Sequence, residues 1–449
     1  MNLQNVYKCD FSYFSNDGLF LLYIIHNKIY CVDLENFEVV TIYVCSYKID
    51  HIEFSNDNKH FLVLMKKHGC VCIYSLYENI LINKIEDYFQ TYVYSSFINK
   101  DNGILVHKYE KKSICIYDFK ESEQCVINIP NVKYNTKGYC FDKDKNIFAC
   151  IIEANKRDYI ALTSLLNYNQ INSIACTNFH PTIIFFTNKN DIITYSNINK
   201  SIHMYSLNGE LLFIYNLTHE LANINVTSLS DKKNVFSVGM EDGTVDILNL
   251  ENLKKIKTFL LDEKIKMNEQ LKIYRENISS KDIKNYGTSL NDVIYSTHDK
   301  KEFSFYSKIS EGIIGNYKIR TTKEKNDKIT KIGITVLKFS LCGNYISVVD
   351  ENHNNVVRIY ETEDYSCITI LEQKKKITNL QWDNILNKPR LSICTNTAYV
   401  YVWFPDGCAI IDMPTGFLCN TALWNSCGSV LLVKNSDKIA VLYQEKQKK

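Results

Sequence analysis

Proline and glycine are scarce in this chain, with only 5 and 15 among its 449 residues, well below average usage. Asn, Lys, Asp and Ser stand where turns would normally carry glycine, so we expect turns of the Asx type. Long apolar runs are also missing. No segment approaches the ~20 uninterrupted apolar residues that a membrane-spanning helix needs, so we expect a soluble protein with no membrane contact.

An excess of one charge is missing as well. The 52 Lys and Arg residues nearly cancel the 50 Asp and Glu residues, for a formal net charge of +2. Proteins that bind a phosphate backbone usually carry a strong positive excess, so nucleic acid is not expected as a partner. The first residues lack a basic segment followed by an apolar run, so we expect no secretory leader and 16 reduced cysteines in the cytoplasm.

The motifs of common enzymes and metal sites are absent too. The sequence has no GxxxxGK[ST] or GxGxxG phosphate loop, no HExxH and no GxSxG. Cys70 and Cys72 are close, but an i, i+2 spacing on a strand only points two thiols to one face. We therefore expect a non-catalytic protein without a cofactor or a metal.

Apolar and aromatic residues are abundant. Hydrophobic residues make up 45% of the chain and aromatic residues 12%, with 31 Tyr and 22 Phe. These residue types favour strands that are buried on both faces. The composition therefore predicts a large, tyrosine-rich β core.

One unit recurs from end to end. It has a short apolar strand, an aromatic-Ser-x-Asp/Asn turn, a second apolar strand, a polar turn, and a third strand that ends in an aromatic residue. The clearest copy covers 336–349 and 356–361. The nine copies are anchored on Phe14, Phe54, Phe97, Phe141, Phe179, Leu229, Phe339, Trp382 and Trp424.

The spacing of these anchors predicts the fold. Successive anchors are 38 to 50 residues apart, except for one gap of 110, and ~40–45 residues is the period of WD-type blades. We therefore expect an all-β protein, a WD-repeat β-propeller with about nine blade-like repeats. Because nine exceeds the common four to eight blades per ring, one large ring and two propeller halves both remain open.

The ends of the third strands support the same alignment of the repeats, although the Trp-Asp pair that is typical of WD repeats is mostly replaced. The aromatic ring is mostly kept and the acid is usually lost, as expected if the ring packs between sheets. The expected strand ends are Tyr74-Ser75, Tyr117-Asp118, Tyr205-Ser206, Leu248-Asn249, Tyr360-Glu361, Trp403-Phe404 and Tyr443-Gln444.

The repeats also suggest domain boundaries. We expect blades one to six in 1–260, a charged insert that is either irregular or a degenerate blade in 261–331, C-terminal blades in 332–445, and a basic tail in 446–449. A short strand around Val6 is expected to complete the last blade, because closure of a propeller hides strand edges.

A block in the C-terminal half resembles a known family. Its residues are 331–334 leading into 339–340, then 356–360, 371–373, 380–383, 389–395 and 403–408. They are similar to the centrosomal WD-repeat family encoded in vertebrates antisense to tumour-protein-seventy-three, also called the WDR-eight family. The likeness extends more weakly over the whole chain, and most repeat ends depart from the family by loss of Trp.

The resemblance implies a scaffold in the cytoplasm and cytoskeleton, at the centrosome or spindle pole. Such a scaffold helps anchor microtubule minus ends, with a coiled-coil spindle-pole anchoring protein and, in some lineages, a minus-end-directed kinesin as partners. Arg390, Trp403 and Phe404 are the candidate partner contacts, with core packing as the alternative for tryptophan. The alternative function is a general adaptor, such as a ubiquitin-ligase substrate receptor or a subunit of an RNA-processing complex.

Overall fold

Antiparallel four-stranded sheets make up almost all of the structure. The computed structural model describes residues 2–98, 100–119, 125–133, 137–142, 146–189, 191–217, 222–230, 232–266, 270–279, 303–309, 316–320 and 333–444. These residues contain nine blades and no α-helix, which confirms the expected all-β propeller with nine repeats. The chain divides into two compact units, a five-blade unit of residues 9–221 and a four-blade unit of residues 1–8 and 222–449.

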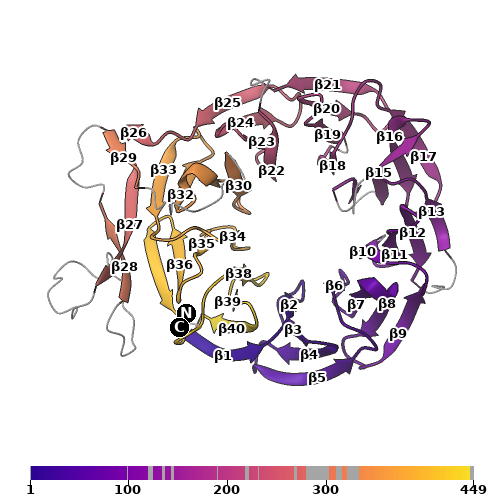
Figure 1. Ribbon diagram of the computed structural model, residues 1–449, viewed down its shortest axis with the longest axis horizontal. Coiled ribbons are helices and arrows are strands. Elements are labelled where there is room, and N and C mark those ends of the chain that lie inside the picture. The colour runs from indigo at the N-terminus through magenta and orange to yellow at the C-terminus, as the bar shows by residue number, and fades with distance from the viewer. Residues whose placement is uncertain are drawn as a thin grey trace. The chain divides into compact units, whose positions relative to one another are not determined.

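The five-blade unit runs without interruption along the chain, from indigo to magenta in Figure 1. In each blade the four strands pair in chain order. The strands are β2 Phe11–Phe14, β3 Phe20–Ile25, β4 Lys28–Asp33 and β5 Glu38–Val44 in blade one; β6 His51–Phe54, β7 His60–Met65, β8 Cys70–Ser75 and β9 Leu81–Glu86 in blade two; β10 Tyr92–Ile98, β11 Gly103–Lys108, β12 Ser113–Asp118 and β13 Cys125–Ile129 in blade three; β14 Tyr139–Asp142, β15 Ile147–Ala154, β16 Arg157–Ser164 and β17 Gln170–Ala175 in blade four; β18 Ile183–Phe186, β19 Ile192–Ser196, β20 Ser201–Tyr205 and β21 Leu211–Asn216 in blade five.

The four-blade unit combines the C-terminal half of the chain with the N-terminal strand. Its strands are β22 Ile224–Ser230, β23 Val235–Met240, β24 Thr244–Asn249 and β25 Lys255–Leu260 in blade six; β30 Ile334–Phe339, β31 Tyr345–Asp350, β32 Val356–Glu361 and β33 Cys367–Glu372 in blade seven; β34 Asn379–Trp382, β35 Leu391–Cys394, β36 Tyr399–Phe404 and β37 Gly407–Asp412 in blade eight; β38 Thr421–Trp424, β39 Val430–Lys434, β40 Lys438–Tyr443 and β1 Asn2–Lys8 in blade nine.

The position of a strand within its blade determines its burial. In blade two the second and third strands, β7 and β8, are buried almost throughout, while the outer strand β9 is mostly exposed. Continuous apolar runs such as that of β7 are typical of strands that are covered on both faces. The cover comes from neighbouring blades, because one sheet cannot bury both of its own faces.

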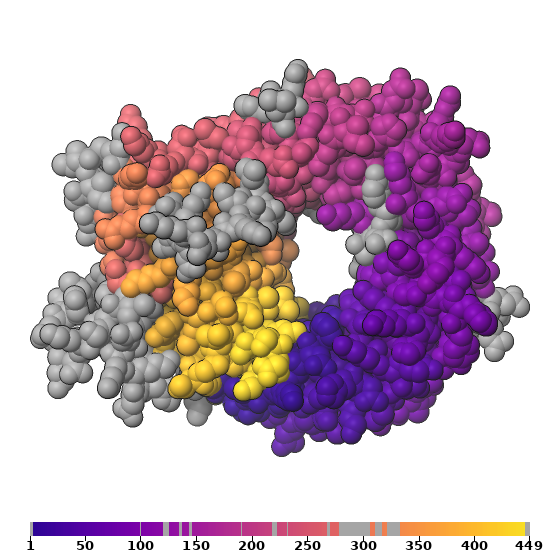
Figure 2. Space-filling model, viewed as in Figure 1, coloured from indigo at the N-terminus to yellow at the C-terminus, as the bar shows by residue number. Residues whose placement is uncertain are grey.

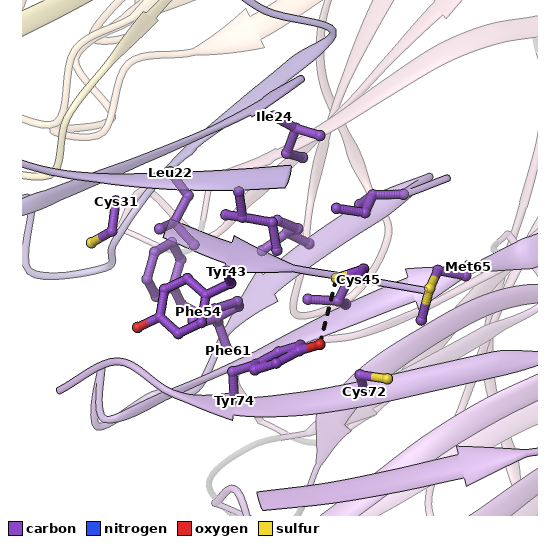
Figure 3. Close-up of a cluster of buried hydrophobic side chains, with 14 of the residues drawn as sticks. Leu22, Ile24, Cys31, Tyr43, Cys45, Phe54, Phe61, Met65, Cys72 and Tyr74 are labelled. Carbon is purple, nitrogen blue, oxygen red and sulfur yellow. Dashed lines mark hydrogen bonds between the residues drawn. The ribbon is translucent and has the colours of Figure 1, made fainter. Parts of the chain in front are cut away.

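Aromatic side chains fill the space between blades. Figure 3 shows the cluster between blades one and two, where Tyr43, Phe61 and Tyr74 lie together. The rings of Tyr43 and Phe61 meet edge to face at 4.9 Å, and those of Phe61 and Tyr74 stack at 5.5 Å. The Tyr43 hydroxyl donates to the Ser75 carbonyl oxygen (3.0 Å). The aromatic residue at the third-strand end is therefore kept for packing, whether or not an acid follows it.

The prediction of Phe179 as a repeat anchor was wrong. Strand β18 begins at Ile183, so Phe179 lies in the linker before it, where its ring stacks on His203 at 3.7 Å. The equivalent residue is Phe186, which pairs with Ile192 as Phe141 pairs with Phe148. Phe179 resembled an anchor because it is a buried aromatic residue followed by a polar turn. With Phe186 as the anchor, the distances to the anchors on either side, Phe141 and Leu229, are 45 and 43 residues.

Asparagine takes the place of glycine in many turns. Of the eighteen non-glycine residues with positive φ among those described, eight are Asn, the residue that best tolerates this conformation after glycine. Turns of adjacent blades also bind one another through side chains. The Asn16 amide donates to the Ser55 carbonyl oxygen (2.9 Å), and the Asn58 side chain accepts from the Asn16 N–H (2.8 Å).

Part of the segment between blades six and seven is built onto blade seven. Strand β27 (Lys272–Ser279) pairs in parallel with β33, and β28 (Phe303–Lys308) pairs with β27, so this sheet has six strands. A separate pair is formed by β26 (Lys264–Lys266) and β29 (Asn316–Lys318). These described strands fall within the 261–331 segment that the sequence set apart as charged.

Buried carboxylates hold this extension in place. The guanidinium of Arg275 pairs with Glu372 at 2.9 Å, and the Tyr317 hydroxyl donates to the other oxygen of Glu372 at 2.7 Å. Glu276 accepts from the Tyr401 hydroxyl of blade eight at 2.6 Å. Charge-assisted hydrogen bonds of this kind are stronger than neutral ones, so the extension is fixed to two blades.

The N-terminal strand completes the last blade. Strand β1 pairs antiparallel with β40, with Val6 opposite Ala440 and Tyr7 opposite Ile439. In Figures 1 and 2 the indigo N-terminal strand adjoins the yellow C-terminal strands. The pairing predicted from the sequence for the residues around Val6 is thus present.

Deleting residues 1–8 should destabilise the four-blade unit. The deletion removes six paired positions and exposes the edge of β40, and each backbone hydrogen bond contributes about 1 kcal/mol. We expect the free energy of unfolding to fall by about 3 kcal/mol or more, measured by urea denaturation, with greater aggregation from the open edge. Val6→Ala is the matched control, since Val6 is exposed. An unchanged stability of the deletion variant would disprove the structural role of β1.

Candidate functional site

The three candidate contact residues lie in blade eight and the turns beside it. Trp403, near the end of β36, is 1% exposed and meets the Trp382 ring edge to face at 5.8 Å. Phe404, the last residue of β36, is half-buried. Arg390 immediately precedes β35 and is directed to blade nine. Core packing therefore accounts for Trp403, and the role of all three residues in partner contact stays a prediction.

Arg390 is the centre of a buried polar network. Its Nε pairs with Asp383 at 2.7 Å, and its backbone N–H donates to the same carboxylate at 3.1 Å. The guanidinium also donates to the Gly428 carbonyl oxygen and to Gln444, and it stacks on the Trp424 ring at 4.2 Å. Because the Asp383 side chain is 0% exposed, its charge depends on Arg390 for compensation.

A second candidate surface lies at one end of the strands of the five-blade unit. Antiparallel strands place the turn between the second and third strands at the same end as the linker to the next blade. In blades two to four, six exposed cations lie in or beside these turns, and the linkers add Lys48 and Lys133. We call this surface the basic turn face; it comprises the turns 26–27, 66–69, 109–112, 155–156 and 197–200 with the linkers 45–50, 87–91, 130–133 and 176–182. The six cations are Lys66, Lys67, Lys111, Lys112, Lys156 and Arg157.

The opposite ends of the same strands are acidic. Among the residues that the structure describes, the turns there expose five carboxylates, and the exposed cations are Lys59, Lys100 and Lys189. These carboxylates belong to Asp17, Glu35, Asp57, Glu78 and Glu210. The five-blade unit therefore separates charge between its two ends, although its net charge is unremarkable.

The four-blade unit lacks this pattern in the corresponding turns. The turn between the second and third strands carries Glu241 and Asp242 in blade six. In blade seven it contains the short 3-10 helix Glu351–His353, where Glu351 pairs with Lys376 at 2.5 Å. The positive charge of the basic turn face is thus specific to blades two to four and does not follow from the repeat itself.

The basic turn face contains a pocket between blades three and four. Its volume is about 310 Å³, and its lining includes Lys112, Lys133 and Lys156 together with Asn131, Asn155 and Glu153. Lys112 and Lys156 form no ion pair with any residue that the structure describes. A polar pocket with two free ammonium groups can bind an anion.

Backbone hydrogen bonds fix the walls of the pocket. Val132 N–H donates to the Lys112 carbonyl oxygen (2.8 Å), and Glu153 N–H donates to the Asn131 carbonyl oxygen (3.0 Å). The linker between the two blades is therefore bound to the turn on each side of it. Such pairing keeps the polar groups of a loop in a defined arrangement.

The third lysine of the pocket is held by a buried carboxylate. Lys133 Nζ lies 2.6 Å from Asp158, which is 4% exposed and also lies 3.0 Å from His180 Nδ1. The pair fixes Lys133 in the pocket wall and offsets its charge. Lys112 and Lys156 are thus the cations that are available to a ligand.

Exposed aromatic residues also belong to the basic turn face. Tyr88 and Phe89 in the linker to blade three are 73% and 89% exposed, and Tyr109 in the adjacent turn is 63% exposed. Tyr109 N–H donates to the Thr91 carbonyl oxygen (2.9 Å), which joins linker and turn. A hydrogen bond from Thr91 in turn lowers the pKa of Glu110. Exposed aromatic residues beside charges are typical of protein interfaces.

Sequence reasoning missed this surface because it used the charge of the whole chain. In the net charge of the whole chain, the cations at one end of the strands are offset by the acidic residues at the other end. The signal is visible once the charges are sorted by their position in the repeat, since the turns alternate between the two ends.

Burial disfavours thiol chemistry at many of the cysteines, although Cys125 and Cys427 are exposed. Burial raises the pKa of Cys31, Cys150 and Cys176 to about 12, and a thiol rather than a thiolate is a poor nucleophile. A hydrogen bond from Cys125 lowers the pKa of Cys115 to about 6, but Cys115 is 4% exposed.

The sulfur atoms of Cys70 and Cys72 are 3.8 Å apart on one face of β8. Among the described residues no three His, Cys, Asp or Glu side chains gather as metal ligands would. Nor does the described part of the chain contain a helix of the length and apolarity required to cross a bilayer.

Comparison with known proteins extends the resemblance to the whole chain. No family model matches it. It is 23% identical over 451 residues to the WD repeat-containing protein WRAP73 of Mus musculus, a match that covers 96% of this chain and 93% of that protein. The chain is therefore similar to the WDR-eight family from end to end. Its similarity to a WD-repeat protein over this length also indicates a protein-interaction scaffold.

Solved structures support the propeller fold. The C-terminal WD40 domain of Sif2 superposes with a TM-score of 0.52 at 10% identity and covers 99% of both chains. A eukaryotic initiation factor superposes with a TM-score of 0.61 at 9% identity and covers 92% of this chain and 90% of its own. Likenesses at this identity show the WD-repeat propeller fold alone.

Replacing Arg390 with alanine should destabilise the four-blade unit, because the change leaves Asp383 charged, buried and unpaired. Loss of one partner of a buried ion pair costs about 3 kcal/mol or more, which urea denaturation would detect. Lys388→Ala, at an exposed neighbouring position, should change stability by less than about 0.5 kcal/mol. If Arg390→Ala kept full stability, the buried network would not be the role of this residue.

Proposed function

We propose that this protein is a non-catalytic scaffold at the spindle pole, centrosome or equivalent microtubule-organising centre, where it helps anchor microtubule minus ends. The observation that carries the proposal is the end-to-end similarity to WRAP73, 23% identity over 96% of this chain. The family that residues 331–408 resemble acts at the centrosome or spindle pole. Fold alone would leave many other functions open.

The structure supports a role in assembly. Nine blades place many turns and linkers at the ends of the strands, and the five-blade unit carries a charged surface beside exposed aromatic residues. Surfaces of this kind bind proteins rather than transform small molecules. The partners that we propose are a coiled-coil spindle-pole anchoring protein and a minus-end-directed kinesin.

Phe404 is the half-buried member of the proposed contact set in blade eight. It stands at the end of β36 next to Pro405, whose carbonyl oxygen accepts from Lys272 of the blade-seven extension at 3.2 Å. Phe404 and Arg390 are partly exposed and can contact a partner directly. Trp403 is buried and would only support their positions.

Fluorescent tagging of the endogenous protein tests the proposed location. We expect foci at the spindle poles in mitosis, measured as the ratio of polar to cytoplasmic signal, with the tag alone as the control. A diffuse signal throughout mitosis would overturn the proposal. Recovery of cullin or ribonucleoprotein subunits in an affinity purification would favour a general adaptor in its place.

Phe404→Ala should reduce the recovery of anchoring partners from mitotic cells several-fold without changing thermal stability. The reason is that apolar contacts at the centre of an interface contribute most of its affinity. Leu418→Ala is the matched control, because Leu418 is 44% exposed in the same unit. Quantitative mass spectrometry of the purified complexes is the measurement, and equal recovery from both variants would remove Phe404 from the contact set.

A further inference from the structure

We propose that the pocket between blades three and four of the five-blade unit binds an acidic peptide segment of a partner protein. The proposal rests on the scaffold role only in taking the partner to be a protein. The pocket and the charges around it are independent of where the protein acts in the cell.

The charge of the pocket selects an anion. Lys112 and Lys156 stand on its two sides, one from the turn of each blade, and both are without an ionic partner among the described residues. Lys111 and Arg157 are the next residues in the same two turns. The pocket that Lys112 and Lys156 line has a volume of about 310 Å³, which is large enough to receive carboxylate side chains rather than a single ion.

The backbone at the pocket is unusual for the residues that occupy it. Lys112 and Lys156 have φ of 45° and 60°, as do Asn131 and Asn155 with 58° and 50°. Asparagine tolerates this left-handed conformation, but lysine does not favour it. Lys100 and Lys200 adopt the same conformation and do not line the pocket, so the backbone positions the two pocket lysines but does not by itself indicate a ligand.

Aromatic residues provide the second half of the contact. Tyr109 belongs to the same turn as Lys112, whose N–H donates to the Tyr109 carbonyl oxygen (3.1 Å). Phe89 and Tyr88 follow in the adjacent linker and are among the most exposed large side chains of the chain. A segment whose acids bind the lysines could therefore place an apolar residue on these rings.

The pattern of charge favours a peptide over a nucleic acid. Glu110 and Glu153 lie among the cations, and they would repel a continuous phosphate backbone, which needs several adjacent cationic contacts to bind well. A peptide can place its acids opposite the lysines and its neutral residues opposite the glutamates. Electrostatic complementarity of this kind contributes to specificity.

Fluorescence anisotropy of a fluorescein-labelled oligoglutamate peptide with the full-length protein tests the proposal. We expect saturable binding that weakens as salt is added, and a loss of affinity of about tenfold or more in the Lys112→Glu/Lys156→Glu double variant. Lys59→Glu/Lys100→Glu is the matched control. It makes the same change in charge at the acidic end of the unit, and Lys100 also has a positive φ, of 49°.

Three results would overturn the proposal. They are no binding of the peptide, an equal loss of affinity in both double variants, and tighter binding of a single-stranded RNA or of phosphatidylserine vesicles than of the peptide. Matching melting temperatures of the two double variants show that both are folded. If the peptide does not bind but the tagged protein forms foci at the spindle poles, only this inference is rejected. If the peptide binds but the tagged protein stays diffuse in mitosis, only the proposed location is rejected.

Discussion

Burial of both faces of each sheet is the constraint on which this structure depends. The middle strands of a blade, such as β7 and β8, are apolar on both sides, and each large side chain gains about 1.5–3 kcal/mol on burial. A lone blade would lose this gain on both faces at once. Contacts such as that of Tyr43 with Phe61 and Tyr74 exist because a neighbouring blade supplies the missing cover. Strand β1 meets a different demand, because it covers the backbone edge of β40.

This constraint made the repeats visible in the sequence. Two-sided burial produces apolar runs at a fixed period, so nine blades and the third-strand ends could be predicted from residues alone. The anchor at Phe179 failed because linkers also bury aromatic rings, here against His203. The parallel pairing of β27 with β33 could not be predicted, since it depends on Arg275 meeting Glu372, 97 residues away in the chain.

The candidate sites were less predictable than the fold. A strand buries its side chains whatever the partner of the protein is, so burial leaves a signal in every copy of the repeat. A binding surface leaves a signal only where charges from several turns meet. Lys112 and Lys156 are 44 residues apart in the sequence and share one pocket. Their relation emerges only when the register of blades three and four is known.

Divergence in this family has therefore acted differently on strands and on turns. Where the Trp-Asp pair has eroded, an aromatic ring usually remains, as Tyr74 and Tyr360 show, because packing between blades requires the ring but not the acid. Turns carry no such requirement beyond a suitable φ, which asparagine meets at eight of the described positions. Lysine meets it at four more, and two of these, Lys112 and Lys156, line one pocket, so the charge of a turn can change while the fold stays intact.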